Sequence, residues 1–487
     1  MTLFEVCKPI DAHSGSFADA SELPEGWLYL QLREVGTWCT GGTPSRKVPA
    51  YFGGKIPWVK SGDLNDGVVT KTDEFISDAG LENSAAKLLP RGTLSVALYG
   101  ATIGKVGILA IDAATNQACA NCVLDEGLVD RAFLFHYVIS QRQALIDAGQ
   151  GGAQPNISNE ILKNWPLAFP PLAEQRRIAA KVEAVLAKAS AARQRLAKVP
   201  AILNRFRQSV LAAACSGRLT EDWRNASDTR DNDANSDVPA HWVERTISEA
   251  CTAIVDCPHS TPKWTPVGKL CVRTTNFKVG VLDLSEVRYV APEEFARRIS
   301  RLRPEPGDVL YSREGGILGI ACEVPAGTEL CLGQRMMLMR ADAARYASTF
   351  LMHVLNSPDT VKRVEELTGG SASPHLNVGD IKRFPVPTPP LAEQHEIVRR
   401  VSALFALADK VEARLAAATA AVERVTRAVL AKAFRGELVE TEASLARREG
   451  RDYEPAAKLL ERISAAHRTS DSDRAKRTRQ KRSRSTR

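Results

Sequence analysis

The chain has 487 residues, of which 44% are hydrophobic and 25% charged, so it is too long for one ordinary core and suits two to four globular domains. No stretch approaches the ~18 consecutive apolar residues of a membrane span, and the N-terminus lacks a basic region followed by an apolar one, so we expect a cytoplasmic protein without membrane contact. The formal net charge of +8 comes mostly from residues 468–487, which carry nine Lys or Arg against Asp471 and Asp473.

The ten cysteines are scattered along the chain, and in a reducing compartment we expect them to be free thiols. Cys119 and Cys122 have the CxxC spacing of a zinc-ligand pair. A structural zinc site needs a second pair, and the sequence has none with suitable spacing. We therefore expect no metal site.

Taken in chain order, residues 1–169 predict a first globular domain, because short β-prone segments such as 92–97 and 106–111 are bounded by Gly, Pro, Asn or Asp. Residues 170–219 predict a long helix, and the polar, turn-rich residues 220–237 predict a linker. Residues 238–388 predict a second domain, with strands near 309–312 and 335–340. A second long helix is expected over 389–438, followed by a C-terminal helix and a disordered basic tail over 439–487.

An internal repeat organises this order. The string PPLAEQ begins at Pro170 and again at Pro389, an offset of 219 positions, and each copy leads into an alanine-rich segment that ends in G-x-L. Fainter matches reach the preceding domains, where LPEGW at 23–27 resembles VPAHW at 238–242 and Asn116-Gln117 resembles Gly333-Gln334. The chain is therefore two copies of one unit, a divergent domain followed by a similar helix.

Both helices carry an apolar seam at alternating steps of four and three residues, which is a coiled-coil signal, and each narrow seam must be covered by another helix. We expect the two helices to pair antiparallel about a pseudo-twofold axis. Pro171 and Pro390 suit a first helical turn, and Gly217 and Gly436 suit helix ends. Pro200 lies inside the first seam, where Thr419 lies in the second, and predicts a kink or break. The seam residues are Ile178, Val182, Val185, Ala189, Ala192, Leu196, Val199, Leu203, Phe206 and Val210, then Ile397, Val401, Leu404, Ala408, Val411, Leu415, Ala418, Val422, Val425 and Val429.

These motifs identify a family resemblance. The order of domains and helices, both PPLAEQ strings, SGRLTEDWR at 216–224, the two openings and GATIGKVGI at 100–108 resemble the specificity subunits of type I restriction-modification systems over nearly the whole chain. In the second domain, Ser312–Ile317 departs from the GATIGK form.

The resemblance implies an α+β fold with two mixed α/β target recognition domains separated by two long helices in an antiparallel coiled coil. Each domain would read one half of a split target in double-stranded DNA. The helices would set the half-site separation and dock two methyltransferase subunits, which restriction (translocase-nuclease) subunits would join. Residues 172–214 span 43 positions, about 64 Å if continuous, or about two turns of B-DNA.

Base edges are read by hydrogen-bonding side chains on protruding loops. We expect such contacts from loops that are rich in polar residues in both domains. In the first domain the candidates are Thr43, Ser45, Arg46, Lys60, Ser61, Asp63, Thr102, Lys105, Asn156 and Ser158. In the second they are Ser260, Lys263, Arg273, Thr275, Asn276, Arg313, Gln334 and Arg335.

Catalytic motifs are missing from the sequence. FPPL and TPPL are explained as helix starts rather than as an adenine methyltransferase motif, and the GATIGK string has the wrong spacing for a phosphate-binding loop. We therefore expect no catalytic residue and no bound cofactor in this chain, with S-adenosylmethionine, ATP and magnesium implied for partner subunits. The alternative is a coiled-coil scaffold that binds proteins but has no DNA specificity.

Overall fold

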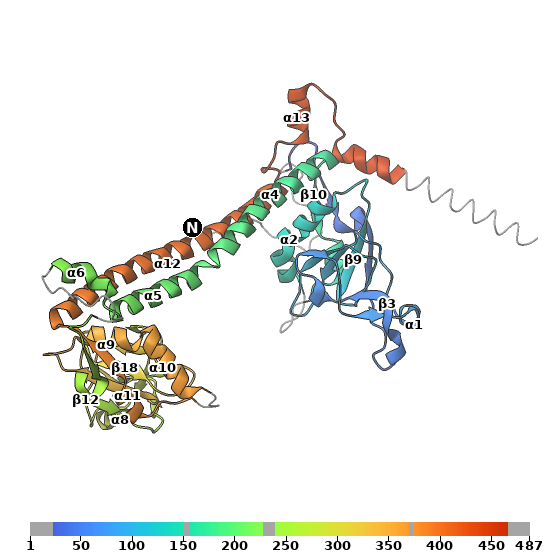
Figure 1. Ribbon diagram of the computed structural model, residues 1–487. Helices are drawn as coiled ribbons and strands as arrows, with labels where there is room; N and C mark the ends of the chain where they lie inside the picture. Colours follow the sequence, from blue (N-terminus) through green and yellow to red (C-terminus); the bar gives the residue numbers. More distant parts are fainter. Residues whose placement is uncertain (1–22, 150–155, 227–238, 370–373, 466–487) are drawn as a thin grey trace, which may run out of the picture. The chain divides into compact units, whose positions relative to one another are not determined.

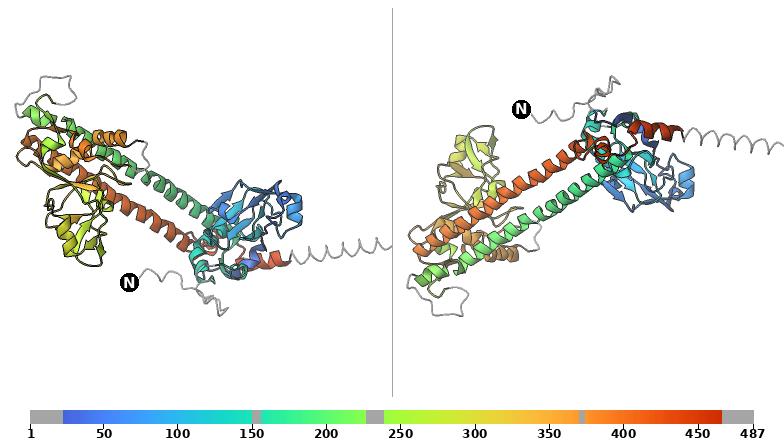
Figure 2. Two further views of the ribbon diagram at one scale, coloured as in Figure 1. Left: turned by 90° about the horizontal axis from the view of Figure 1, so that it is seen from below. Right: turned by 90° about the horizontal axis from the view of Figure 1, so that it is seen from above.

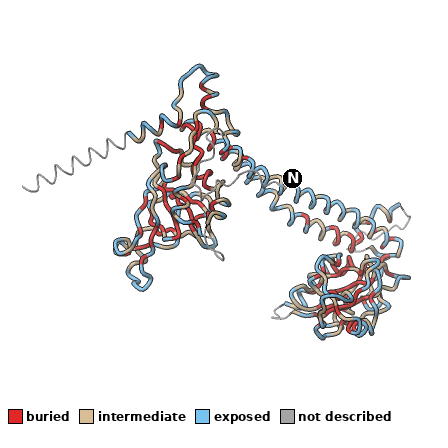
Figure 3. The backbone as a smooth tube through the Cα atoms, turned by 180° about the vertical axis from the view of Figure 1, so that it is seen from behind, coloured by how far each residue is buried: buried red, intermediate tan, exposed pale blue. Residues whose placement is uncertain are grey.

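The computed structural model describes residues 23–149, 156–226, 239–369 and 374–465 (Figure 1). The chain forms two compact units. Unit 1 contains residues 1–194 and 419–487, and unit 2 contains residues 195–418. Each unit therefore combines one globular domain with a part of both long helical segments. In each domain the buried residues gather between the strands and helices, whereas the long helices carry many exposed residues (Figure 3).

The first domain is built on a five-stranded sheet in the order β2-β9-β6-β7-β4 and a three-stranded sheet in the order β5-β3-β8. Strand β1 pairs with β10, so the opening of the domain lies beside its end. The strands are β1 (Leu28–Gln31), β2 (Gly36–Thr40), β3 (Phe52–Val59), β4 (Gly67–Val69), β5 (Phe75–Ile76), β6 (Leu94–Ala97), β7 (Val106–Leu109), β8 (Ala114–Thr115), β9 (Cys119–Leu124) and β10 (Pro166–Phe169). The helices are α1 (Asp78–Glu82), α2 (Arg131–Asp147) and α3 (Asn159–Lys163).

The second domain repeats this plan with sheets in the orders β12-β21-β18-β19 and β13-β17-β14-β20, and β11 pairs with β22. One of the two parallel pairs of the first domain, β3 with β8, recurs as β14 with β20, whereas the other pairs β4 with β7. The strands are β11 (Val243–Thr246), β12 (Cys251–Asp256), β13 (Trp264–Thr265), β14 (Lys269–Val272), β15 (Phe277–Lys278), β16 (Val281–Leu282), β17 (Arg288–Val290), β18 (Val309–Ser312), β19 (Ala321–Glu323), β20 (Leu330–Leu332), β21 (Met336–Ala341) and β22 (Pro385–Thr388). The helices are α7 (Ile247–Ala250), α8 (Pro292–Arg298), α9 (Ser348–Leu355), α10 (Pro358–Thr368) and α11 (Val378–Lys382). The predicted α+β class is confirmed, and the four predicted strands are β6, β7, β18 and β21.

The long helical segments differ in continuity. The first is broken into α4 (Leu172–Leu196) and α5 (Val199–Cys215), as Pro200 predicts, because its ring cannot continue a helix from the preceding turn. The second, α12 (Leu391–Phe434), is one helix of 44 residues, and it contains Thr419 at the matching position (Figures 1 and 2).

Within each unit the helical segments pair antiparallel, as expected. In unit 2, Arg207 of α5 bonds Asp409 and Glu412, whereas Asp222, later in the chain, bonds Arg400, earlier in α12. In unit 1, Ile178 and Val182 near the start of α4 share a core with Ala433 and Phe434 at the end of α12.

Most of the predicted seam is buried or half-buried, with Ile178, Leu203, Ile397 and Ala408 among its buried members. The prediction is wrong at Val425, which is 50% exposed. Val429, the next residue of the seam, is buried again, so the departure is confined to this position.

The predicted linker over 220–237 is also wrong in its first part. Residues Glu221–Ala226 form a helix, α6, and Arg224 is buried against α12. A polar composition predicted a loop, but the polar groups are used in hydrogen bonds to the long helix. Residues 227–238 lie outside the described part of the chain.

The C-terminal segment packs on the first domain. Helix α13 (Glu442–Glu449) is followed by helical residues 456–465, and Ala456 and Leu459 belong to the core of the first domain. The backbone N–H of Ala456 donates to the carbonyl of Gly26 over 3.1 Å. Both helices lie within the predicted C-terminal segment 439–487, and the basic tail over 466–487 lies outside the described residues.

In each unit, a buried histidine of a domain helix lies against a long helix. His136 of α2 approaches Glu183 of α4, and His353 of α9 packs edge-on against Phe405 of α12 with the ring centroids 6.1 Å apart. The strings FLFH at 133–136 and FLMH at 350–353 are another trace of the repeat. Burial lowers the pKa of His136, and it lowers the pKa of His353 to about 4.

Substitution of Leu404 by Glu tests the helix packing. Leu404 is half-buried against the core of unit 2, so Leu404→Glu places a charge there and is expected to cost about 2–4 kcal/mol of unfolding free energy. Leu407→Glu is the matched control, because Leu407 lies three residues further along α12 and is 55% exposed. Chemical denaturation of both variants makes the comparison, and equal midpoints would contradict the packing described.

The lowered pKa of His353 predicts that the folded chain loses stability in acid. The folded chain holds His353 neutral down to about pH 4, whereas the unfolded chain protonates it near its ordinary pKa of 6.5. The neutral, buried His353 therefore makes its full contribution to the unfolding free energy above pH 6.5. That contribution falls by about 3 kcal/mol as the pH is lowered from 6.5 to 4. Denaturation of His353→Gln should show a weaker pH dependence over this window than the parent chain. His395→Gln, on an exposed position of α12, should retain the parent's dependence.

Candidate nucleic-acid interface

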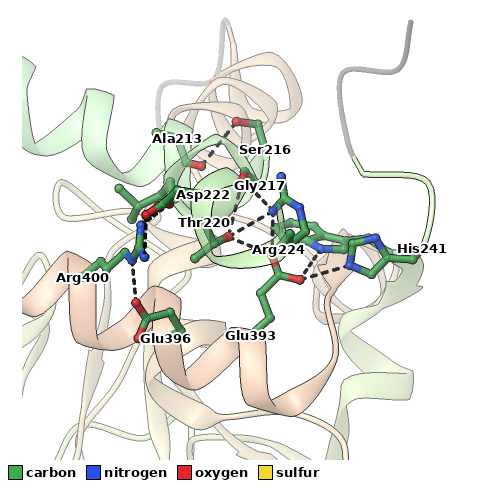
Figure 4. Close-up of polar contacts among 12 residues, drawn as sticks. Ala213, Ser216, Gly217, Thr220, Asp222, Arg224, His241, Glu393, Glu396 and Arg400 are labelled. Carbon is green, nitrogen blue, oxygen red and sulfur yellow. Dashed lines mark hydrogen bonds and ion pairs between the residues drawn. The ribbon is translucent and has the colours of Figure 1, made fainter. Parts of the chain in front are cut away.

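Each domain is fastened to the start of its long helix by a buried glutamate. In unit 2 this residue is Glu393, in the second PPLAEQ string, and it is fully buried. Figure 4 shows its polar contacts with Thr220, Arg224 and His241. Its Oε1 accepts hydrogen bonds from Thr220 (2.8 Å) and Arg224 (2.6 Å), and its Oε2 accepts one from the Trp242 indole (3.0 Å). Burial opposes ionisation, but these bonds, together with that to His241, hold the pKa of Glu393 below its ordinary value.

Glu174, the equivalent residue of unit 1, is also fully buried, but it has a different set of donors. Its Oε1 accepts a hydrogen bond from the Trp27 indole at 2.9 Å, and its Oε2 accepts one from the backbone N–H of Glu442 at 2.8 Å. Neither donor is charged, so burial raises the pKa of Glu174. The same tryptophan-to-glutamate bond thus serves two electrostatically different junctions.

The next residue of each string, a buried glutamine, ties the helix start to the domain backbone. Gln175 accepts from the N–H of Asp130 (2.8 Å), and Gln394 accepts from the N–H of Ala347 (2.7 Å). Both side-chain amides donate over 2.9 Å to the carbonyl of the first proline of their own string. The PPLAEQ string is therefore a helix anchor.

The glycine that ends each long helical segment packs on the opening of a domain. Gly217 and Gly436 both have a left-handed backbone, with φ of +77° and +75°. A Cβ on Gly217 would lie 2.5 Å from Pro239, and one on Gly436 would lie 2.4 Å from Pro24. Only glycine satisfies both the conformation and the space. The three motifs that mark the repeat, the opening, PPLAEQ and G-x-L, therefore meet at one junction in each unit.

A charged cluster brings together several predicted loop residues of the first domain. Glu74 bonds Arg46 and Lys60, each at 2.7 Å, and the Lys60 hydrogen bond is the main reason that the pKa of Glu74 is lowered. Arg46 also lies over the Phe52 ring, 4.6 Å from its centroid. Asp63 accepts from the N–H of Lys60, and that bond closes the turn containing the half-exposed Ser61. Ser45 is exposed in the loop beside Arg46.

A second set of contacts joins this loop to the one containing Thr102 and Lys105, both half-buried. Asp66 has a left-handed backbone with φ of +57°, pairs with Arg142 at 2.5 Å and accepts from the N–H of Val106. Arg142 in turn donates to the carbonyl of Gly104. The Thr43 hydroxyl donates to the side chain of Gln117. The segment that contains Asn156 is attached to the domain at Ile157, whose N–H donates to the carbonyl of Leu98. Ser158 caps α3 by accepting from Ile161.

In the second domain, the loops at 256–260 and 332–335 lie against each other. Gln334 donates to the carbonyl of His259 over 2.6 Å, whereas the equivalent Gln117 accepts a hydrogen bond from the Thr43 hydroxyl. Arg335 is exposed, and its backbone is left-handed with φ of +68°. Ser260, Lys263 and Thr275 are exposed, and Arg273 is half-buried.

Two predicted contact residues are corrected. Asn276 is 3% exposed and uses its side chain to bond Arg273, Asp283 and Glu286 backbone groups. Arg313 is 5% exposed and makes a two-pronged ion pair with Asp256 at 2.8 and 2.9 Å. Their hydrogen-bonding capacity is used inside the domain, so both hold loops in place.

Sequence reasoning missed the residues that hold the loops together, including Glu74, Asp66, Arg142 and Arg298. Each connects segments that are distant in the chain, and no local pattern marks such a residue. The exception is Gln117, because the match of Asn116-Gln117 with Gly333-Gln334 pointed to it.

Other chemistry is limited in the part of the chain that is described. Cys119 and Cys122 are buried, and burial raises the pKa of Cys119 to about 12. Within residues 23–149, 156–226, 239–369 and 374–465, no group of three His, Cys, Asp or Glu is placed to hold a metal ion. Over the same residues, no helix combines the length and apolar character needed to cross a membrane.

Comparisons with known proteins agree on one family. The family model described as the type I restriction modification DNA specificity domain matches residues 24–201 and 293–418. The type I restriction enzyme EcoBI specificity subunit of Escherichia coli is 30% identical over 377 residues, covering 74% of this chain and 77% of that protein. The EcoKI specificity subunit of Escherichia coli (strain K12) is 28% identical over 479 residues, covering 94% and 99%.

The fold is shared with a solved chain of a type I restriction-modification system, in a structure described in terms of complex assembly and conformational transition. That chain is 20% identical and superposes with a TM-score of 0.65 over 85% of this chain and 99% of its own length.

Substitution of the two junction glutamates by glutamine is expected to lower the unfolding free energy by different amounts. Glu393→Gln removes the charged partner from the buried Arg224–Glu393 ion pair and is expected to cost about 3–5 kcal/mol. Glu174→Gln removes one acceptor from neutral donors and is expected to cost about 1–3 kcal/mol. Denaturation of the two isosteric variants gives the ranking, and an equal or reversed order would show that Arg224 is not what distinguishes the junctions.

Proposed function

Since the chain belongs to the type I restriction-modification DNA specificity family, we propose that it selects the DNA sequence on which a methyltransferase and restriction complex acts. Each domain reads one half of a split target in double-stranded DNA. The chain has no catalytic residue of its own and binds no cofactor. S-adenosylmethionine, ATP and magnesium belong to the partner subunits.

One observation carries the split-target proposal. The two domains share the strand order of the main sheet (β2-β9-β6-β7 and β12-β21-β18-β19) and the tryptophan-to-glutamate bond at the helix start, yet the loops beside the equivalent residues Gln117 and Gln334 are built from unlike side chains. In the first domain the loops are joined by Glu74 and by Asp66 with Arg142. In the second they are joined by Arg298 and Arg313. Sequence is read by base-edge contacts from such loops, so unlike loops select unlike half-sites.

The long helices support the role of spacer. Helix α12 has 44 residues, which is about 66 Å at 1.5 Å per residue and close to two turns of B-DNA. The exposed faces of α4, α5 and α12 then serve as docking surfaces for two methyltransferase subunits, which the restriction subunits join.

Methylation mapping tests this function. Cells that carry this chain with its methyltransferase partner should contain methylated adenines in one target with two unlike parts separated by unread bases. A gel shift with random duplex DNA, with and without the methyltransferase, separates the proposal from the alternative of a coiled-coil scaffold. A scaffold without DNA specificity yields no sequence-selective complex in either case.

Exchange of one domain predicts a change in one half-site. Replacing residues 239–384 with the equivalent domain of a related specificity subunit should alter one part of the methylated target and leave the other part unchanged, because base contacts lie within a module. Sequencing of the methylome before and after the exchange gives the answer. A change in both half-sites would overturn the modular reading.

A further inference from the structure

Arg298, the last residue of α8, is a buried cation outside the predicted recognition loops. Its side chain is fully buried, and its neighbour Arg297 on the same helix is 59% exposed. Burying a guanidinium is expensive unless every donor is satisfied. The hydrogen-bond partners of Arg298 therefore indicate its role in the domain.

All the nitrogen atoms of the guanidinium are used. Nε donates to Glu294 at 2.7 Å. Nη1 donates to the carbonyls of Leu332 (3.1 Å) and Gly333 (3.2 Å), and Nη2 donates to the carbonyl of Ser260 at 2.7 Å. One planar group thus binds three backbone carbonyls from two loops that lie more than 70 positions apart in the chain.

Those loops contain residues expected to meet DNA. Ser260 is itself one of them, and Gln334 and Arg335 follow directly after Gly333. The direct contact between the loops is the bond from Gln334 to the His259 carbonyl. Beneath it, Glu294 fixes the orientation of Arg298, and burial of Glu294 is outweighed by its bonds to Arg297 and Arg298, which lower its pKa.

The first domain closes the equivalent loops in another way. There the backbones of the two loops meet directly: the N–H of Gly42 donates to the carbonyl of Thr115 over 2.9 Å, and a Cβ on Gly41 would lie 2.2 Å from the carbonyl oxygen of Asn116. Backbone-to-backbone packing takes the place of the buried arginine. Arg298 is thus a feature of the second domain only.

We propose that Arg298 is the positioning residue for sequence recognition by the second domain, because it sets the distance between the Ser260 loop and the Gln334–Arg335 loop. This inference rests on the function proposed above. Direct readout needs donors and acceptors placed to a fraction of an ångström, so a loosened pair of loops loses discrimination before it loses contact with the DNA backbone. Arg298 itself does not touch DNA.

The test compares Arg298→Lys with Arg297→Lys in the full chain assembled with its methyltransferase partner. Lysine keeps the charge but cannot bridge both loops and Glu294 with a planar fork. After methylation mapping has given the parent target, methylation rates are measured on duplexes with that target and with single mismatches in each half-site. For Arg298→Lys, discrimination against mismatches in the second domain's half-site should fall by about tenfold, within the range that one mismatch normally supplies. Discrimination in the first half-site, and the rate on the parent target, should stay within about twofold of the parent chain. Arg297→Lys should match the parent throughout.

Glu294→Gln is the second variant, because it keeps the volume and an acceptor for Arg298 while loosening its orientation. It should relax the same half-site to a smaller extent. Unchanged discrimination in an assembled Arg298→Lys complex overturns the proposal, and so does relaxation of both half-sites. If neither variant assembles with the methyltransferase, Arg298 serves stability and the positioning role is wrong. If the parent complex gives no split target at all, it is the proposed function that fails.

Discussion

A carboxylate buried in the first turn of each long helix is the constraint on which the rest of the structure depends. Glu174 and Glu393 carry no exposed surface, so each needs donors that the chain must bring from far away. Trp27 and Trp242 supply one donor each from the domain openings. The helix start is thereby locked to the domain that precedes it, and the domain cannot rotate freely about that helix.

The remaining donors come from different sources in the two units. Glu393 is satisfied by Arg224 and Thr220, from the segment after the first helical region, and Glu174 by the backbone at Glu442, from the segment after the second. Each glutamate therefore receives a donor from the segment that follows the other repeat's helix. The antiparallel arrangement inside each unit follows from this exchange, because the end of one helical segment must reach the beginning of the other.

Outside these junctions, the two domains differ in their loops and in their buried polar groups. Their main sheets share the order β2-β9-β6-β7 and β12-β21-β18-β19, and the strand pairs β1–β10 and β11–β22 lead the chain to the same kind of helix start. The loops do not connect to the long helices, and the buried polar groups of each domain have different hydrogen-bond partners. The first uses a glycine contact at Gly42 and an exposed charged cluster around Glu74, while the second uses the buried guanidinium groups of Arg298 and Arg313. Buried polar networks of this kind tolerate only one arrangement, since an unsatisfied member is costly.

The sequence by itself determined the repeat, the α+β class, the helix starts and ends, and the break at Pro200, because each depends on local pattern or on conformations that only proline and glycine allow. It misjudged Val425, which is exposed although Val429, the next residue of the seam, is buried. It also misread residues 220–226 as a linker. Polar residues normally indicate an exposed loop, but here their side chains form hydrogen bonds to a buried partner, Glu393. Only the tertiary structure decided that Asn276 and Arg313 face inward and that Arg298 joins two recognition loops. Such roles depend on which distant carbonyls and carboxylates the fold brings within hydrogen-bonding distance, and no spacing along the chain encodes that.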